Sequence, residues 1–153
     1  MENAELFWLI RVGFSFSPAG DNWGFLNGRK QDWLTFDQLG QADKGYIRLD
    51  ESESVANIRI ALVALKRGLP PGETDAMFVY DANSYACGSG GCSLDILLLF
   101  SDGRFHHVFS VVCGAGVDYP GVTLGSSYTN GMRNIRFDDA VTWIWNGKTY
   151  VLK

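Results

Sequence analysis

The sequence predicts an α+β domain that consists mainly of an antiparallel β-sheet meander with one central helix. From residue 76 onward, short apolar runs rich in β-branched and aromatic residues alternate with turn-forming residues. Before them, residues 50–69 place apolar side chains at helical spacing. A length of 153 residues is typical of one domain, so residues 1–153 are expected to share a single core.

Residues 1–49 are expected to form a loop-rich N-terminal part, because their aromatic residues come in short bursts between turn formers. The run "GFSFS" alternates between apolar and polar residues, as a strand with one apolar face does. We expect one or two strands in this part, and a short helix around Thr35–Leu39.

Residues 50–69 are the best helix candidate in the chain. The residues at helical spacing are Val55, Ile58, Leu62 and Leu65. Asp50 or a nearby serine can cap the start, and Gly68 followed by Pro70 ends the segment. The run "IRIALVAL" also alternates and is rich in β-branched residues, so a strand is the competing interpretation. We favour the helix.

Residues 76–153 are expected to form the β-meander. "AMFVYD" leads through a cysteine loop into "SLDILLLF", and a tight turn at residues 101–103 leads into "RFHHVFSVV". The last hairpin is "AVTWIWNGKTYVL", whose Asn146-Gly147 pair suits a two-residue turn with positive φ at both positions. This turn would place Trp145 opposite Lys148 and Trp143 opposite Tyr150.

Charge and hydropathy argue against two classes of partner. The formal net charge is -4 and the sequence pI is about 5.0, which disfavours nucleic acid and anionic membranes and favours a basic partner protein. No apolar stretch approaches the roughly 18 residues that a membrane span needs. Glu2 and Glu5 precede the first apolar run, which is unlike a secretory leader, so either the protein stays inside the cell or its leader is missing from this chain.

The loop "CGSGGC" raises three possibilities. A phosphate-binding loop requires a following helix with a lysine at its start, and here Cys92 and a strand follow instead. Zinc could use Cys87, Cys92 and Cys113 with His106 or His107, but structural zinc usually has two ligand pairs. Adjacent strand histidines point to opposite faces, so one is expected to face the core and the other the solvent.

The favoured interpretation is a Cys87–Cys92 disulfide that closes a turn between two strands. Four small residues separate the two cysteines and permit the close approach that a disulfide requires. Such bonds persist in oxidising compartments, so the pair is also the main argument for a periplasmic or secreted protein. Cys113 would then remain a free thiol.

No catalytic set, cofactor motif or metal site is favoured. A Cys113 nucleophile with His106 or His107 as its base lacks a helix N-terminus or cation to depress the thiol pKa. Asp138 and Asp139 precede a hairpin and are expected to be solvated turn residues.

Three aromatic residues of the last hairpin, Trp143, Trp145 and Tyr150, are expected to share one face, with Ile144 on the other. If that face were exposed, the rings would be a platform for a sugar or for a partner protein. The competing interpretation places these rings in the core, where large aromatics are common.

The segments "YACGSGGCSLDILLLF", "TNGMRNIRF" and "WIWNGKTYVL" resemble, in order and spacing, an uncharacterised group of small bacterial domains from secreted proteins and lipoproteins. Those domains similarly carry a Cys-Gly-Ser/Thr-Gly-Gly-Cys loop and close on a strand with an Asn/Asp-Gly turn. The resemblance covers about residues 76–153, and Cys113 is extra. It implies an envelope location and the Cys87–Cys92 pairing, and it transfers no catalytic residues.

We therefore expect a non-enzymatic extracytoplasmic binding domain, of the kind represented by an inhibitor or immunity protein that binds a basic toxin or hydrolase. One alternative is a module that binds carbohydrate or peptidoglycan fragments through Trp143 and Trp145. The other is a Cys-dependent hydrolase that uses Cys113.

Overall fold

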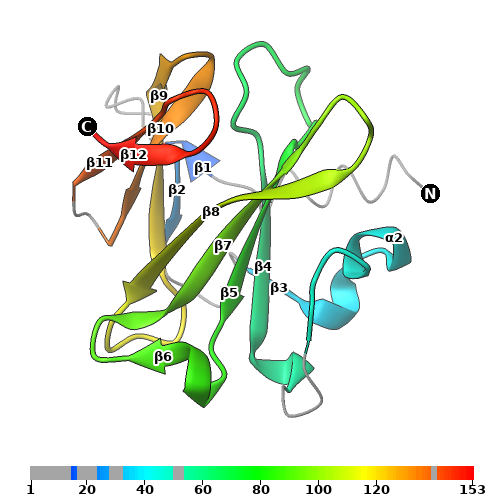
Figure 1. Cartoon of the computed structure of the whole chain (residues 1–153), viewed down its shortest axis with the longest axis vertical. Coiled ribbons are helices and arrows are strands. Elements are labelled where there is room, and N and C mark those ends of the chain that lie inside the picture. Colours follow the sequence, from blue (N-terminus) through cyan, green and yellow to red (C-terminus); the bar gives the residue numbers. More distant parts are fainter. Residues whose placement is uncertain (1–14, 17–23, 28–32, 50–53, 139–140) are drawn as a thin grey trace.

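The computed structural model describes residues 15–16, 24–27, 33–49, 54–138 and 141–153, and it contains two antiparallel β-sheets (Figure 1). Sheet A consists, in spatial order, of β1 (Ser15–Phe16), β2 (Gly24–Asn27), β9 (Gly121–Thr129), β10 (Met132–Phe137), β11 (Thr142–Trp145) and β12 (Tyr150–Leu152). Sheet B consists, in spatial order, of β3 (Leu34–Thr35), β4 (Ile58–Val63), β5 (Ala76–Asp81), β7 (Gly91–Leu99) and β6 (Cys87–Gly88), and β8 (Phe105–Gly114) also pairs with β7.

Helical structure in the described residues is limited to four short segments: η2 (Phe36–Gln38), α2 (Gln41–Lys44), η3 (Val55–Asn57) and η4 (Ser84–Ala86). The expected short helix around Thr35–Leu39 is present as η2. Its start is fixed because the Thr35 N–H donates to Gln38 Oε1 over 2.8 Å.

The prediction of a central helix at residues 50–69 is wrong. Residues 50–53 lie outside the described residues, and the rest of the segment contains only η3 before strand β4. The reason is that β4 is buried on both faces. Ile60 and Leu62 belong to a cluster on one face of sheet B, whereas Ala61 and Val63 belong to the cluster on the other face. A strand that is apolar at nearly every position also satisfies the spacing of a helix.

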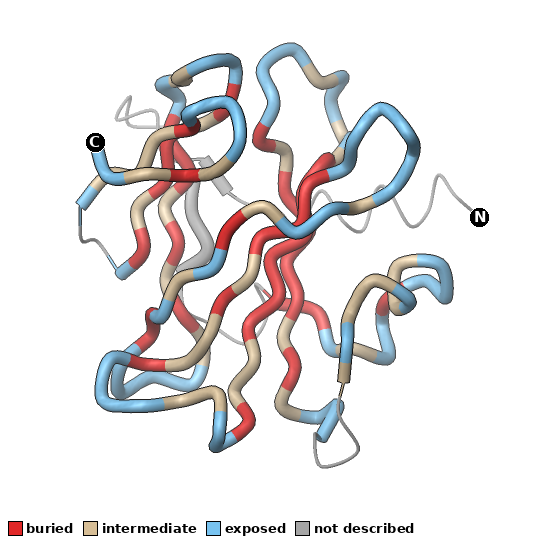
Figure 2. The backbone as a smooth tube through the Cα atoms, in the orientation of Figure 1, coloured by how far each residue is buried: buried red, intermediate tan, exposed pale blue. Residues whose placement is uncertain are grey.

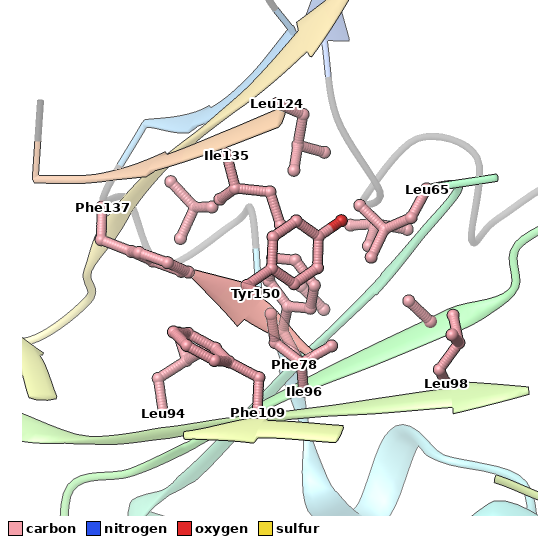
Figure 3. Close-up of a cluster of buried hydrophobic side chains, with 14 of the residues drawn as sticks. Leu65, Phe78, Leu94, Ile96, Leu98, Phe109, Leu124, Ile135, Phe137 and Tyr150 are labelled. Atoms are coloured by element: carbon pink, nitrogen blue, oxygen red, sulfur yellow. The ribbon is translucent and has the colours of Figure 1, made fainter. Parts of the chain in front are cut away.

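The main core lies between the two sheets (Figure 2). Sheet A contributes residues such as Leu124, Ile135 and Tyr150, and the inner face of sheet B contributes residues such as Phe78 and Ile96, all fully buried (Figure 3). Phe109 of β8 contacts rings from three strands of sheet A, namely Phe137, Trp143 and Tyr150, with centroid distances of 6.0, 5.0 and 5.9 Å. Aromatic packing of this kind joins the two sheets.

A second cluster covers the outer face of sheet B. Ile58, Ile60, Leu62, Met77, Val79 and Leu97 of the sheet pack against Leu34 and Leu39, with Phe36, Tyr46, Ile47, Leu49 and Phe105 at its margin. Residues 34–49, which begin in β3 at the edge of the same sheet, therefore cover this face. The loop-rich N-terminal part that the sequence predicts accordingly supplies a third layer over sheet B.

The two sheets are also joined by backbone hydrogen bonds just after β4. The Arg67 N–H donates to the Gly131 carbonyl over 2.7 Å, and the Arg133 N–H donates to the Leu65 carbonyl over 2.9 Å. Asp75 stabilises this junction, because its buried carboxylate accepts hydrogen bonds from the N–H groups of Leu65 and Lys66 over 2.7 and 3.0 Å. Burial nevertheless raises the pKa of Asp75 above 3.8.

The predicted meander is present, but its strands are divided between the two sheets. Strands β5, β7 and β8 follow one another in sheet B, and β9 to β12 follow one another in sheet A. The register of the last hairpin differs from the prediction: Trp145 pairs with Tyr150, and Trp143 pairs with Leu152. The turn has four residues because Asn146 Oδ1 accepts hydrogen bonds from the N–H groups of Lys148 and Thr149, each over 2.9 Å.

The pKa of Asp75 leads to a prediction about stability. Between pH 3.8 and the higher folded pKa, the folded chain binds more protons at Asp75 than the unfolded chain does. The contribution of Asp75 to the free energy of unfolding is therefore fully present below pH 3.8 and is lost as the pH rises through the folded pKa. Urea unfolding of the native chain and of Asp75→Asn should be compared from about pH 3 to about pH 7. The free energy of unfolding of the native chain minus that of the variant should fall as the pH rises. A difference that rises with pH would show that the two N–H donors outweigh burial.

Candidate functional site

A groove of about 600 Å³ lies on the outer face of sheet B, where the cover formed by residues 34–49 ends. Its floor crosses four neighbouring strands, β4, β5, β7 and β8, and residues 45–48 after α2 form one wall. A concave site of this size is within the usual range for ligand-binding pockets.

The floor of the groove is apolar because it continues the outer cluster. Ile58, Val79 and Leu97 belong to that cluster and also line the groove. The wall is held to the sheet by an edge-to-face contact between Tyr46 and Phe105, with 5.3 Å between ring centroids. The groove therefore has an apolar floor and a wall that packs against the sheet.

A β-bulge in β8 brings His107 to the groove. Ile96 pairs with Phe109 and Leu97 pairs with His107, so Val108 is the extra residue of the bulge. Without the bulge, Val108 would pair with Leu97, and His107 would face the other side of the sheet. With it, His107 shares the outer face with Asp95 and Ser110, which pair directly with each other.

These three residues form a polar cluster at the edge of the groove. His107 Nε2 lies 3.1 Å from Asp95 Oδ1 and 2.8 Å from Ser110 Oγ, and the Ser110 hydroxyl donates to Asp95. The imidazole is 55% exposed and the carboxylate 41% exposed.

The arrangement differs from a catalytic relay. In a relay, the carboxylate holds one ring nitrogen and the serine meets the other, so the histidine can remove the serine proton. Here both partners lie against the same nitrogen, and the serine proton is directed to the carboxylate. The cluster therefore suits the presentation of a carboxylate and an imidazole in fixed positions.

A second carboxylate lies at the groove on the neighbouring strand. Asp81 Oδ1 accepts hydrogen bonds from the N–H and the side-chain amide of Asn83, both over 2.9 Å. Two exposed guanidinium groups, those of Arg48 and Arg104, are also at the groove. The site thus combines an apolar floor with charges of both signs.

His106 interacts with the turn before β8. Its Nε2 lies 2.8 Å from Asp102 Oδ2, and its ring lies over Phe100, with 4.6 Å between centroids. The Arg104 N–H and then His106 hold the pKa of Asp102 below 3.8. The prediction that one of the two histidines faces the core is wrong, because the side chains of His106 and His107 are 44% and 55% exposed. The bulge at Val108 turns His107 to the outer face, and His106, which pairs with Leu98, is exposed beside the turn at residues 101–103.

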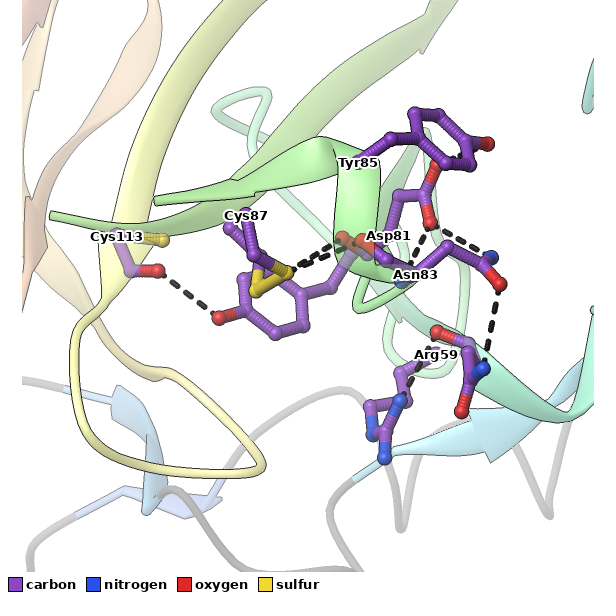
Figure 4. Close-up of a disulfide and its surroundings, with 9 residues drawn as sticks. Arg59, Asp81, Asn83, Tyr85, Cys87 and Cys113 are labelled. Atoms are coloured by element: carbon purple, nitrogen blue, oxygen red, sulfur yellow. Dashed lines mark hydrogen bonds between the residues drawn. A yellow bond between two sulfur atoms is a disulfide. The ribbon is translucent and has the colours of Figure 1, made fainter. Parts of the chain in front are cut away.

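The Cys87–Cys92 disulfide predicted from the sequence is confirmed, and it joins β6 to β7 (Figure 4). The zinc ligand set considered from the sequence does not come together. Two of its cysteines are bonded to each other, and His107 lies about 20 Å along β8 from Cys113, at roughly 3.3 Å per residue.

The pairing of Cys113 with a histidine base fails for the same reason. Cys113 is 2% exposed, and burial, with a smaller effect from Asp138, raises the pKa of its thiol to about 12. Asp138 also has a structural contact, because its Oδ2 accepts the Gly114 N–H over 2.6 Å. Asp139 lies outside the described residues.

The three hairpin aromatics share one face as predicted, and that face meets the core. Trp145 and Tyr150 are 7% and 2% exposed, and Trp143 packs against the same cluster. The sugar-platform hypothesis for Trp143, Trp145 and Tyr150 therefore does not match their positions, because the packing of the two sheets uses their rings. The Tyr150 hydroxyl donates to the Arg133 carbonyl over 2.8 Å, and burial raises the pKa of Tyr150.

Sequence reasoning missed most of the groove. Asp95 and Ser110 become neighbours through strand pairing, and Tyr46 reaches the groove because residues 34–49 cover sheet B. The adjacent histidines were the one local signal. The bulge that turns His107 to the outer face is marked by no turn residue.

Among the residues that the structure describes, none belongs to a helix with the length and hydrophobicity that a membrane crossing requires. Comparisons of the chain with protein-family models, with curated proteins and with solved structures found no match. The resemblance to small secreted domains stays a prediction, and the groove is the feature of the described residues that bears on function.

The contact between Tyr46 and Phe105 should be energetically coupled. Tyr46→Ala, Phe105→Ala and the double variant form a cycle whose coupling energy in urea unfolding should be about 0.5–1.5 kcal/mol. The control cycle pairs Tyr46→Ala with Phe100→Ala, whose ring contacts His106 instead. Equal coupling in both cycles would contradict a specific contact at the groove wall.

Proposed function

We propose that this protein is a non-enzymatic extracytoplasmic binding domain that takes a segment of a partner protein into the groove on sheet B. The observation that carries the proposal is an apolar floor, formed by Ile58, Val79 and Leu97, beside carboxylates that internal hydrogen bonds hold in place. Apolar floors with a few fixed polar groups are typical of recognition sites.

The groove favours an extended segment with both apolar and basic side chains. Apolar side chains would cover the floor, and lysine or arginine side chains would meet Asp81 and Asp95. The guanidinium groups of Arg48 and Arg104 can donate hydrogen bonds to the carbonyl groups of such a segment. The net charge of -4 would favour the approach of a basic partner.

Binding a partner of this chemistry would suit an inhibitor or immunity protein. Such a protein blocks a basic toxin or hydrolase by occupying its surface. The disulfide supports a periplasmic or secreted location, because cytosolic thiols are kept reduced. The resemblance to bacterial secreted domains supports the same location.

The alternatives have less support. Carbohydrate binding would need exposed rings, whereas Trp145 and Tyr150 are buried. A Cys-dependent hydrolase would need a base near Cys113 and a thiol with a depressed pKa.

Site-specific photo-crosslinking in a bacterial envelope extract tests the proposal. A benzoylphenylalanine replaces Arg104 at the groove in one variant and Leu152, which is 57% exposed on sheet A, in a second. We expect a protein adduct at position 104 and none at position 152. Adding His107→Trp to the first variant should abolish the adduct, because the indole fills the groove.

Lys148→Trp, which adds the same ring at the exposed turn of the last hairpin, is the matched control and should leave the adduct intact. Equal adducts at positions 104 and 152, or no adduct at position 104, would overturn the proposal.

A further inference from the structure

The three cysteines of the chain lie in register across three neighbouring strands. Cys87 of β6 pairs with Cys92 of β7, and Cys92 pairs with Cys113 of β8. Directly paired residues of antiparallel strands share a face, so all three side chains lie on the inner face of sheet B. In Figure 4 the sulfur of Cys113 points toward the disulfide.

The backbones of β7 and β8 come close together at this position. A Cβ on Gly91, the residue before Cys92, would lie 2.0 Å from the Cys113 carbonyl oxygen, so only glycine fits there. Paired residues of antiparallel strands have Cα atoms about 4.5–5.5 Å apart, which lies within the range of about 4.4–6.8 Å that disulfides span. Cys113 is therefore placed to bond to Cys92 without a rearrangement of the sheet.

We propose that Cys92 is the shared sulfur of an internal thiol–disulfide exchange in which Cys113 displaces Cys87. The Cys113 thiol loses its proton, and its thiolate attacks Cys92 Sγ. The Cys92–Cys113 bond forms as the Cys87–Cys92 bond breaks, and Cys87 leaves as a thiolate that takes a proton from solvent. One disulfide and one thiol are present before and after, so no oxidant or reductant is consumed.

The exchange moves the free thiol from a buried to a more accessible position. Cys113 is 2% exposed, whereas Cys87 is partly exposed at the end of the hairpin that it closes. After exchange, Cys87 is a site for covalent modification by small thiol-reactive compounds or by a disulfide of another molecule. The chain thus carries a second disulfide isomer with a reactive thiol.

Two features keep the exchange slow in the native state. Burial raises the pKa of the Cys113 thiol to about 12, so its thiolate is scarce at neutral pH. The Tyr80 hydroxyl also donates to the Cys113 carbonyl over 2.9 Å, which holds this end of β8 in place. Alkaline pH should accelerate the exchange. At pH values below the thiol pKa, each increase of one pH unit raises the thiolate fraction about tenfold.

Alkylation of the native chain tests the proposal. Iodoacetamide is added at about pH 7 and at about pH 9, which differ about 100-fold in thiolate fraction, and the chain is digested with trypsin without reduction. Trypsin releases Cys87 and Cys92 together in residues 68–104, and Cys113 in residues 105–133. Exchange therefore links two tryptic peptides that are separate beforehand.

We expect little labelling at the lower pH. At the higher pH we expect label on Cys87 together with a disulfide-linked pair of the two peptides. Label confined to Cys113, with the two peptides still separate, would overturn the proposal.

Two matched variants test the geometry without exchange, and each leaves two thiols in the chain. Cys87→Ser leaves Cys92 opposite Cys113, and diamide, an azo oxidant that takes up the two thiol hydrogens, should join them. Cys92→Ser leaves Cys87 and Cys113 two strand spacings apart, roughly 9 Å, beyond the limit of about 7 Å for a disulfide. It should keep both thiols.

Near-ultraviolet circular dichroism checks that each variant is folded. Folded Cys87→Ser that stays reduced, or equal intramolecular oxidation of both variants, would contradict the register on which the proposal depends. If Cys87→Ser does not fold, the alkylation of the native chain decides.

Discussion

The structure depends on the burial of both faces of sheet B. Its inner face packs against sheet A through Phe78, Ile96 and Phe109, and its outer face packs under residues 34–49. Burial of apolar area is the main favourable term in folding. Strands that are covered on both faces have the most apolar area removed from contact with water. The hydrogen-bonded junction near Asp75 and Arg133 then sets how the two sheets meet.

The groove follows from the same constraint. The cover over the outer face ends at residues 45–48. Part of the apolar outer face therefore stays uncovered, next to the polar residues of β5, β7 and β8. Asp81, Asp95 and His107 come to that border through strand pairing and one bulge. Internal hydrogen bonds fix these groups, which favours recognition of a partner over acid–base chemistry. The disulfide lies on the other face of the same sheet, so the exchange proposed for Cys92 is separate from the groove.

The sequence predicted local features better than long-range ones. The runs that became β5, β7 and β8 and the small residues between Cys87 and Cys92 each carry a signal within a few residues. Residues 58–63 were misassigned because a strand with two buried faces has no polar side to reveal its period. The predicted register of the last hairpin is wrong because the Asn146 side chain caps a longer turn. The division into two sheets and the pairing of Asp95 with Ser110 depend on contacts between segments that are distant in the sequence.

Hydrogen–deuterium exchange of backbone amides, followed by NMR, tests the two-sided burial of sheet B most directly. We expect the amides of β4 and β5 to exchange slowest in the chain, because their hydrogen bonds break only when both covering layers open. The amides of β12, a three-residue strand at the edge of sheet A, should exchange much faster. Exchange in residues 58–63 as fast as in residues 150–152 would contradict the claim that β4 is a central strand with two buried faces.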